Sequence, residues 1–339
     1  MSPAPLQSPA PVASHSCTFS KKLSIFLCFF ITSQVSLAQD SLIVPDSYKD
    51  SETGYKTLNK KRLWFITGVN IAGYGGSLII LNNTWYKNYA HTSFHTFNDS
   101  REWLQVDKSG HGWTAYNTGR ASSAMWRWAG LSQKKSALIG GISGAAYLTM
   151  IEFLDAHSSK WGWSWSDIGA NILGSGLFLS QELGWQEQRI QFKFSFHHKD
   201  YGDPILNKRA DELFGKAWYE RMLKDYNAQT YWLSANLKSF FKQSHLPAWL
   251  NLSIGYGADG MFGGFENKWI DGDPGFPINR TDIPRRRQFY LAPDIDFTKI
   301  KTNKKWLRTG FSFLNSFKCP APALMIDSKG KMKAYLFYF

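Results

Sequence analysis

Hydrophobic residues follow two different periods along the chain, one in each half. The first half contains long uncharged segments, and the first of them covers residues 63–86. Its small residues recur four positions apart and share one helix face: Gly68, Ala72 and Gly76. Such a stripe lets helices approach closely, and the segment is long enough either to cross a membrane or to lie buried in a protein. Similar segments follow, so we expect a helical bundle across residues 61–188.

The second half changes to a period of two. Residues 189–198 read RIQFKFSFHH, in which hydrophobic and polar positions alternate. This pattern predicts a strand with one buried face. Similar short segments follow between Gly, Pro and Asn turns, with one amphipathic helix expected at residues 208–226, and the final aromatic Phe339 is a familiar end for an outer-membrane strand. We therefore expect an α+β fold, with an antiparallel β region over residues 189–339 that forms a sheet or a partial barrel.

The N-terminal segment predicts export. Two lysines precede a short apolar run, and Ser36 and Ala38 stand where a signal peptidase reads small residues. We expect a signal peptide at residues 1–38, followed by an extended polar arm at residues 39–60. Cys28 lies in the apolar run without a lipobox, so we do not expect a lipoprotein.

Composition narrows the chemistry and the partners. Removal of the signal peptide would leave Cys319 alone, which excludes an intrachain disulfide framework and a cysteine-based zinc site. The net charge of +13 is spread along the chain without a nucleic-acid-binding signature. We therefore expect no nucleic-acid partner, and we expect a membrane or lipid, because an anionic surface suits this charge. A protein partner in the outer membrane stays open.

Polar residues form stripes on three of the expected helices. Asp107 and His111 are four apart, as are Asp167 and Asn171, so each pair shares one helix face. Glu152 ends a long uncharged run in the helix between them. Burying an ionisable group without a partner is costly, so such stripes tend to face one another. We expect these five residues to surround one polar pocket.

Three interpretations of this pocket stay open. His111, Glu152 and Asp167 have the side chains needed for acid–base catalysis or for binding a hard or borderline metal ion. Alternatively, Asp107 pairs with His111 and Asn171 satisfies backbone groups, in a network that fixes the helix register. The third interpretation is a ligand pocket without catalysis. No P-loop, HExxH, CxxC or nucleophile elbow is present, so the sequence identifies neither a metal nor another cofactor.

Lys108 is expected to be a snorkelling residue at a helix end. It stands next to Asp107 near the expected start of a helix. A lysine there usually lays its stem on apolar surface and keeps its ammonium group in solvent.

The order of the polar motifs resembles a known family. DKSGH at residues 107–111, Glu152 in a small-residue helix and SDIGANILG at residues 166–174 resemble the YfiM-like family of uncharacterised bacterial envelope proteins. A more distant resemblance is to VanZ-like membrane proteins, which have a similar Asp-Lys-x-x-His, Glu, Asp-x-x-x-Asn-x-x-Gly order. The resemblance covers residues 65–190 and implies a fold and an envelope location, without a defined activity.

These observations predict an exported protein in the periplasm or outer membrane of a Gram-negative bacterium. Its helical pocket either holds the structure together or binds a lipid-like ligand. The alternative is a hydrolase that modifies lipid or cell wall, with His111 as the base and Glu152 or Asp167 as its partners. Whether the chain is an enzyme stays open.

Overall fold

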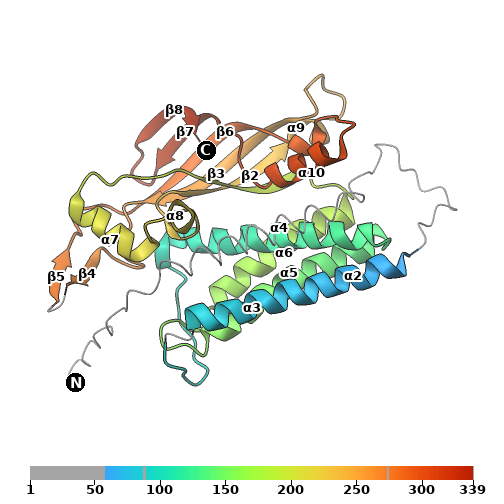
Figure 1. The fold of residues 1–339 in the computed structure, drawn as a ribbon. Helices are drawn as coiled ribbons and strands as arrows, with labels where there is room; N and C mark the ends of the chain where they lie inside the picture. Colours follow the sequence, from blue (N-terminus) through green and yellow to red (C-terminus); the bar gives the residue numbers. More distant parts are fainter. Residues whose placement is uncertain (1–57, 87–88, 273–274, 339) are drawn as a thin grey trace.

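Helices dominate the first half of the chain and an antiparallel sheet follows, which confirms the α+β expectation (Figure 1). The computed structural model describes residues 58–86, 89–272 and 275–338. The predicted signal peptide at 1–38 and the arm at 39–60, except for its last three residues, lie outside this part of the chain.

The principal helices form a layer beneath the sheet, with α4 next to the strands (Figure 1). The helical elements are α2 (Lys60–Asn70), the π turn η1 (Ile71–Gly75), α3 (Gly76–Leu81), the π turn η2 (Asn82–Tyr86), the 3₁₀ turn η3 (Glu102–Gln105), α4 (Val106–Trp128), α5 (Gln133–Asp155), α6 (Trp165–Gly184), α7 (Pro204–Phe214), α8 (Trp218–Lys224), α9 (Leu237–Phe240), the 3₁₀ turn η4 (Phe297–Lys299) and α10 (Lys305–Leu314).

Six of the described strands form one antiparallel sheet in the order β1-β2-β3-β6-β7-β8, and β4 pairs with β5 apart from it. The strands are β1 (Ile190–Phe196), β2 (Gln229–Asn236), β3 (Leu250–Asp259), β4 (Lys268–Asp271), β5 (Phe276–Asn279), β6 (Arg286–Ile295), β7 (Ala321–Asp327) and β8 (Met332–Tyr338).

The sheet curls strongly across its width. Three strands separate β2 from β8, yet the hydroxyl groups of Thr230 and Tyr338 lie 3.0 Å apart. Tyr338 also stacks on Tyr290 of β6, with ring centroids 4.6 Å apart. At the other edge, Phe194 of β1 exchanges backbone hydrogen bonds with the segment just before β7. The described strands therefore enclose a narrow interior rather than a flat surface.

The polarity of the sheet is inverted. The sequence predicted one buried face for β1, but Gln191, Lys193 and Ser195 on its polar face are all buried. These side chains point into the curled interior, where the Lys193 ammonium lies 2.9 Å from a carboxylate oxygen of Asp294. The interior also holds an apolar cluster that includes Trp232, Tyr290 and Tyr338, and further large apolar side chains lie on the other side of the sheet.

Two of the three residues in the small-residue stripe of the first helix do not pack against a described neighbouring helix. Gly68 and Ala72 are exposed, and no atom lies within 4 Å of where a Gly68 side chain would begin. A different face of the helix, including Ile66 and Asn70, is buried. The period of four was correct for a helix, but periodicity alone did not identify which face packs.

Two helical segments, Lys60–Leu81 and Gln133–Asp155, are long and apolar enough to cross a membrane. This is weak support for a membrane span, because core helices of soluble proteins meet the same criterion. The most apolar window of Lys60–Leu81 is only 22% buried, so the fully buried alternative for this segment is wrong.

Glycines bring α4 very close to both neighbouring helices. A Cβ atom on Gly174 of α6 would lie 2.1 Å from the carbonyl oxygen of Gly112 in α4. A Cβ atom on Gly140 of α5 would lie 2.4 Å from the carbonyl oxygen of Gly119. Only glycine fits at such distances. These contacts fix the separation of the three helices that carry the predicted pocket residues.

Candidate functional site

Helix ends bring the polar residues together. Asp107 stands in the first turn of α4, Asp167 in the first turn of α6, and Glu152 in the last turn of α5. Ser164 caps α6, because its hydroxyl accepts the backbone N–H of Asp167 at 3.0 Å. Since α4 packs directly on α5 and α6, these three turns meet at one end of the bundle.

The turn before α4 is strained and is held by the β region. The backbone φ angles of Trp103, Leu104 and Gln105 are 46°, 50° and 65°. Residues other than glycine rarely adopt such positive values. The backbone N–H of Trp103 donates to the carbonyl of Gly264 at 2.8 Å, and the Tyr256 hydroxyl donates to the carbonyl of Leu104. Strain of this kind persists only where the surroundings fix it. The β region therefore sets the direction in which α4 begins.

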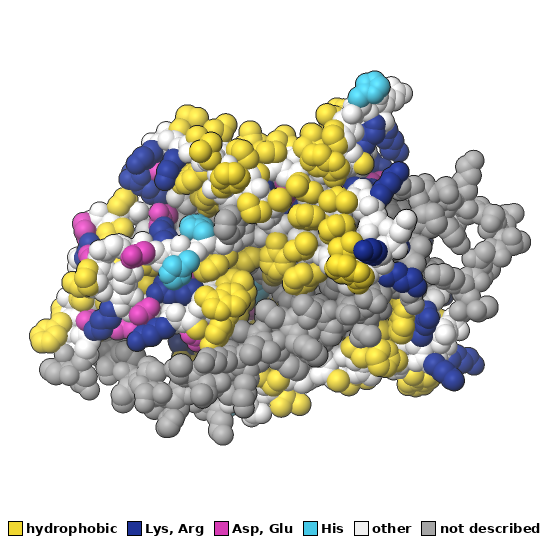
Figure 2. Space-filling model, turned by 45° about the horizontal axis from the view of Figure 1, so that its top comes forward, with side chains coloured by type: hydrophobic (Ala, Val, Ile, Leu, Met, Phe, Trp, Pro, Cys, Tyr) yellow, Lys and Arg dark blue, Asp and Glu magenta, His cyan; other side chains and the backbone are white. Residues whose placement is uncertain are grey.

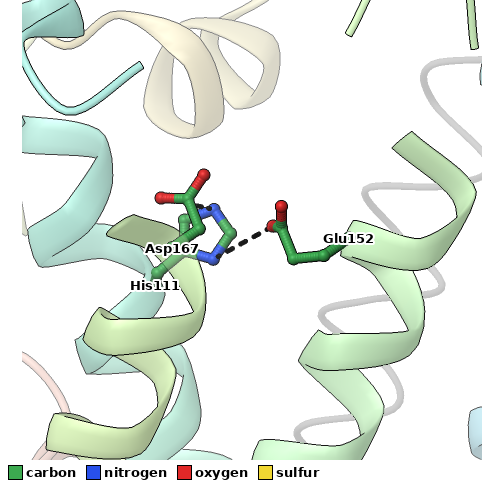
Figure 3. Close-up of side chains that lie close together, drawn as sticks. All are labelled: His111, Glu152 and Asp167. Atoms are coloured by element: carbon green, nitrogen blue, oxygen red, sulfur yellow. Dashed lines mark ion pairs between the residues drawn. The ribbon is translucent and has the colours of Figure 1, made fainter. Parts of the chain in front are cut away.

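The imidazole of His111 lies between two carboxyl groups (Figure 3). Its Nδ1 atom lies 3.9 Å from Oε1 of Glu152, and its Nε2 atom lies 3.8 Å from Oδ1 of Asp167. The Asn171 side-chain oxygen lies 3.2 Å from the same Nδ1 atom. The predicted convergence of the three helical stripes is confirmed.

Lys108 occupies the centre of the acidic cluster, so its expected exposure was wrong. Its ammonium nitrogen lies 2.9 Å from Asp107, 2.7 Å from Asp167 and 2.5 Å from Asp99. Its side chain is only 11% exposed. The sequence also gave no signal for Asp99, which comes from a loop. The Ser164 and Ser166 hydroxyl groups each donate to one Asp99 oxygen at 2.6 Å.

The carboxyl groups of the cluster differ in pKa, because burial and the neighbouring charges and hydrogen bonds act on each of them differently. Burial raises the pKa of Glu152 to about 9, and the negative charge of Asp167 adds to this effect. Burial likewise raises the pKa of Asp107 to about 6, against the opposing effect of Lys108. For Asp99, hydrogen bonds from Lys108 and the serines outweigh burial and lower the pKa to about 2. At neutral pH, Glu152 therefore carries a proton and Asp99 a negative charge.

The polar network differs from the closed structural network that was one of the three interpretations. Asp107 is paired with Lys108 rather than with His111, and Asn171 contacts His111 rather than the backbone. Among the described residues, Asp107 Oδ1 and Asn171 Nδ2 are buried without a hydrogen-bond partner. Each unsatisfied group is costly, so a purely structural network explains the arrangement poorly.

The same three residues have a geometry that suits a cation. One ligand atom from each of His111, Glu152 and Asp167 lies within 4.8 Å of the other two. One nitrogen and two carboxyl groups suit a hard or borderline divalent ion. However, the Lys108 ammonium already contacts Asp167 Oδ1, so the cluster has a positive charge of its own at one of these oxygens.

A cavity of about 580 Å³ follows α4 from this cluster toward the other end of the helix. Its size falls in the usual range for ligand pockets. Asp107 and His111 line it near the start of α4. Its aromatic and aliphatic lining includes Trp113, Leu148, Ile151, Phe178, Phe194, Phe313 and Phe317. The cavity thus joins a polar cluster to a largely apolar space.

Arg120 also lines this cavity, and sequence reasoning missed it. Its guanidinium group donates to the Ser312 carbonyl at 3.0 Å and to the Ser316 hydroxyl at 2.7 Å. Burial lowers its pKa. No carboxylate of the described residues lies within 4.0 Å of it, whereas Arg127 in the same helix pairs with Glu182 at 2.6 Å. Arg120 therefore presents a positive charge that its hydrogen bonds do not neutralise.

Comparison with known proteins places the site inside one matched segment. Residues 96–180 match a family described as "Predicted periplasmic lipoprotein (DUF2279)". This segment contains all five residues predicted for the pocket. No curated protein and no solved structure matches the chain.

The family description supports an exported protein of unknown activity, and it does not specify the outer membrane. The comparisons give no support for the resemblance to YfiM-like or VanZ-like proteins. The word lipoprotein differs from the expectation drawn from Cys28, a residue that lies outside the described part of the chain.

Proposed function

We propose that this exported protein binds an anionic amphiphile, such as a fatty acid or a lysophospholipid, in the cavity along α4. The observation that carries the proposal is Arg120, whose guanidinium group lines an apolar cavity without a carboxylate partner among the described residues. A buried cation is stable only with compensating charge or hydrogen bonds. A carboxylate or phosphate headgroup would supply that charge.

The surroundings of Arg120 fit the rest of such a ligand. Phe194 of β1 and Phe313 and Phe317, at and beyond the end of α10, line the same cavity. Trp113, two turns earlier in α4, lies against Phe194 with ring centroids 5.4 Å apart and the ring planes tilted by 45°. These rings offer an apolar wall for an acyl chain, while Arg120 fixes the headgroup, which is the usual division of labour in ligand pockets.

Replacement of Arg120 tests this proposal. We expect Arg120→Gln to weaken binding of a fluorescent fatty acid by about 10- to 100-fold, the usual value of a hydrogen bond to a charged group. Binding of a neutral monoacylglycerol should change little. The matched control is Arg101→Gln, because Arg101 is exposed and outside the cavity. Equal loss for the neutral and the anionic ligand, or no loss for either, would contradict the proposed role of Arg120.

A second candidate is a hydrolase acting on lipid or cell wall, and the position of His111 favours it. Its imidazole lies between a protonated Glu152 and the carboxyl group of Asp167. Asp167 would orient the ring, His111 would act as the general base on water, and Glu152 would donate a proton to the leaving group. The cluster opens onto the cavity through His111 and Asp107, so a bound lipid could present an ester there.

Replacement of His111 tests the second candidate. If the site hydrolyses esters, His111→Ala should lower turnover of a p-nitrophenyl acyl ester by about 100-fold or more, as loss of a general base does. Its circular dichroism and melting temperature should stay close to the wild-type values. Absence of turnover in the wild-type protein, or equal turnover in both proteins, would remove the hydrolase and leave amphiphile binding unaffected.

A further inference from the structure

The outward face of the curled sheet is apolar on four neighbouring strands. Ile254 of β3 is 58% exposed, and Leu336 of β8 is 82% exposed. The inward residues are buried and mixed in character: Ser253 and Asp294 are polar, whereas Tyr290, Met325 and Tyr338 belong to an apolar cluster. The large exposed side chains of this face are Leu252, Ile254, Phe289, Leu291, Leu324, Ile326, Met332 and Leu336. Water-exposed sheets have the opposite polarity.

Strand register shows that this face continues an interface already buried within the molecule. Tyr231 of β2 packs with Val106 of α4, and its partner across the ladder is Tyr256 of β3. Tyr256 in turn pairs with Phe289 of β6, and Phe289 pairs with Ile326 of β7. Both Phe289 and Ile326 are exposed. The helical layer therefore covers this face at β1, at β2 and at the end of β3 that carries Tyr256 and Ala258, and the exposed residues farther along β3 and on β6, β7 and β8 are open in the described structure.

Charged residues lie at both ends of the apolar strands (Figure 2). Exposed Lys329 and Lys331 lie in the turn between β7 and β8. At the opposite end, exposed Lys242 precedes β3 and exposed Lys304 follows β6. The strands between these ends are up to 10 residues long, which corresponds to about 33 Å, close to the thickness of a bilayer's hydrocarbon core.

We propose that this outward face, defined by Leu252, Ile254, Phe289, Leu291, Leu324, Ile326, Met332 and Leu336, is a lipid-contacting surface that packs against the acyl chains of a bilayer. Hydrocarbon favours a sheet whose polar groups are paired on the inside and whose outward side chains are apolar. The flanking lysines complement anionic headgroup phosphates at both ends of the strands.

A bilayer fits this face better than a second copy of the chain. A second copy would bring the same lysines into register at both ends of the interface, and like charges repel. The proposal concerns residues outside the cavity along α4, so it stands independently of amphiphile binding.

Site-directed labelling in vesicles tests the surface. The probe is a fluorophore attached to Ile254→Cys, in full-length protein with Cys17→Ser, Cys28→Ser and Cys319→Ser. The matched control is the same probe on Lys208→Cys of α7, because the Lys208 side chain is 57% exposed and lies outside the apolar face. In vesicles of phosphatidylethanolamine and phosphatidylglycerol, brominated acyl chains should quench the probe at position 254 several-fold more than the probe at position 208.

Two results would overturn the proposal. One is equal quenching at positions 254 and 208 by brominated lipid. The other is shielding of position 254 from aqueous iodide in lipid-free protein, which would show that a protein segment or a second copy covers the face. As an independent measurement, the pair Ile254→Glu and Leu291→Glu should reduce co-flotation with vesicles while Lys208→Glu should not, in proteins of equal circular dichroism. Unchanged flotation of the charged pair would also contradict the proposal.

Discussion

Glu152→Gln is expected to make the folded protein more stable at neutral and mildly alkaline pH. Burial raises the pKa of Glu152 from 4.5 to about 9, so the folded state holds a proton that the unfolded state releases. The unfolded state then binds fewer protons, and the free energy of unfolding must fall as pH rises between about 4.5 and 9. Glutamine keeps the shape and carries no ionisable proton, so this loss disappears.

The expected gain is on the order of 1–3 kcal/mol near pH 8, allowing for relaxation around a buried group. Urea unfolding of both proteins at several pH values measures it. The wild-type stability should decline through the window from about 4.5 to 9, and the variant should decline less.

A buried glutamate with a cation partner is the matched control. Glu182 of α6 accepts a hydrogen bond from Arg127 at 2.6 Å, so Glu182→Gln should destabilise the protein instead. Parallel pH profiles for wild type and Glu152→Gln would show that Glu152 is ionised in the folded protein, and the charge assignment within the cluster would be wrong.

Lys108→Met is expected to destabilise the protein by about 3–5 kcal/mol near neutral pH, the usual cost of breaking a buried ion pair. The Lys108 ammonium contacts Asp99, Asp107 and Asp167, and methionine would leave these carboxylates without their cation. The loss should be smaller at low pH, where the carboxyl groups take up protons and no longer need the lysine.

The control for Lys108 is Lys208→Met on the surface. Lys208 pairs with Asp271 at 2.8 Å, but its side chain is 57% exposed, so this change should have little effect on the stability of the protein. Thermal unfolding of the three proteins at two pH values provides the comparison. A change of similar size for Lys108→Met and Lys208→Met would contradict the central position of Lys108.

The helical part of the pocket was predictable because helix geometry links sequence spacing to a face. Asp107 and His111 stand one helical turn apart, as do Asp167 and Asn171. Because the rest of each helix is largely apolar, these polar residues were expected to face one another inside the bundle. The partners outside this periodic pattern were missed. Asp99 comes from a loop without a repeat, and Lys108 belongs to a residue type that usually reaches solvent.

Arg120 was missed for a different reason. Its significance is that no described carboxylate lies within 4.0 Å of its guanidinium group, and a missing ion-pair partner cannot be read from sequence spacing. The strands show a similar limit of prediction from sequence. The period of two in residues 189–198 identified β1 correctly. Alternation separates two faces without saying which one meets solvent, and here Lys193 is on the inside.

The most direct test of the proposed function is to map where a photoactivatable fatty acid becomes attached. After illumination and peptide mass spectrometry, we expect adducts on the cavity wall, within residues 113–120 of α4 and residues 312–317. These adducts should decrease sharply in Arg120→Gln. Adducts confined to the outward sheet residues, such as Ile254 and Leu291, and unchanged in Arg120→Gln, would contradict ligand binding in the cavity along α4.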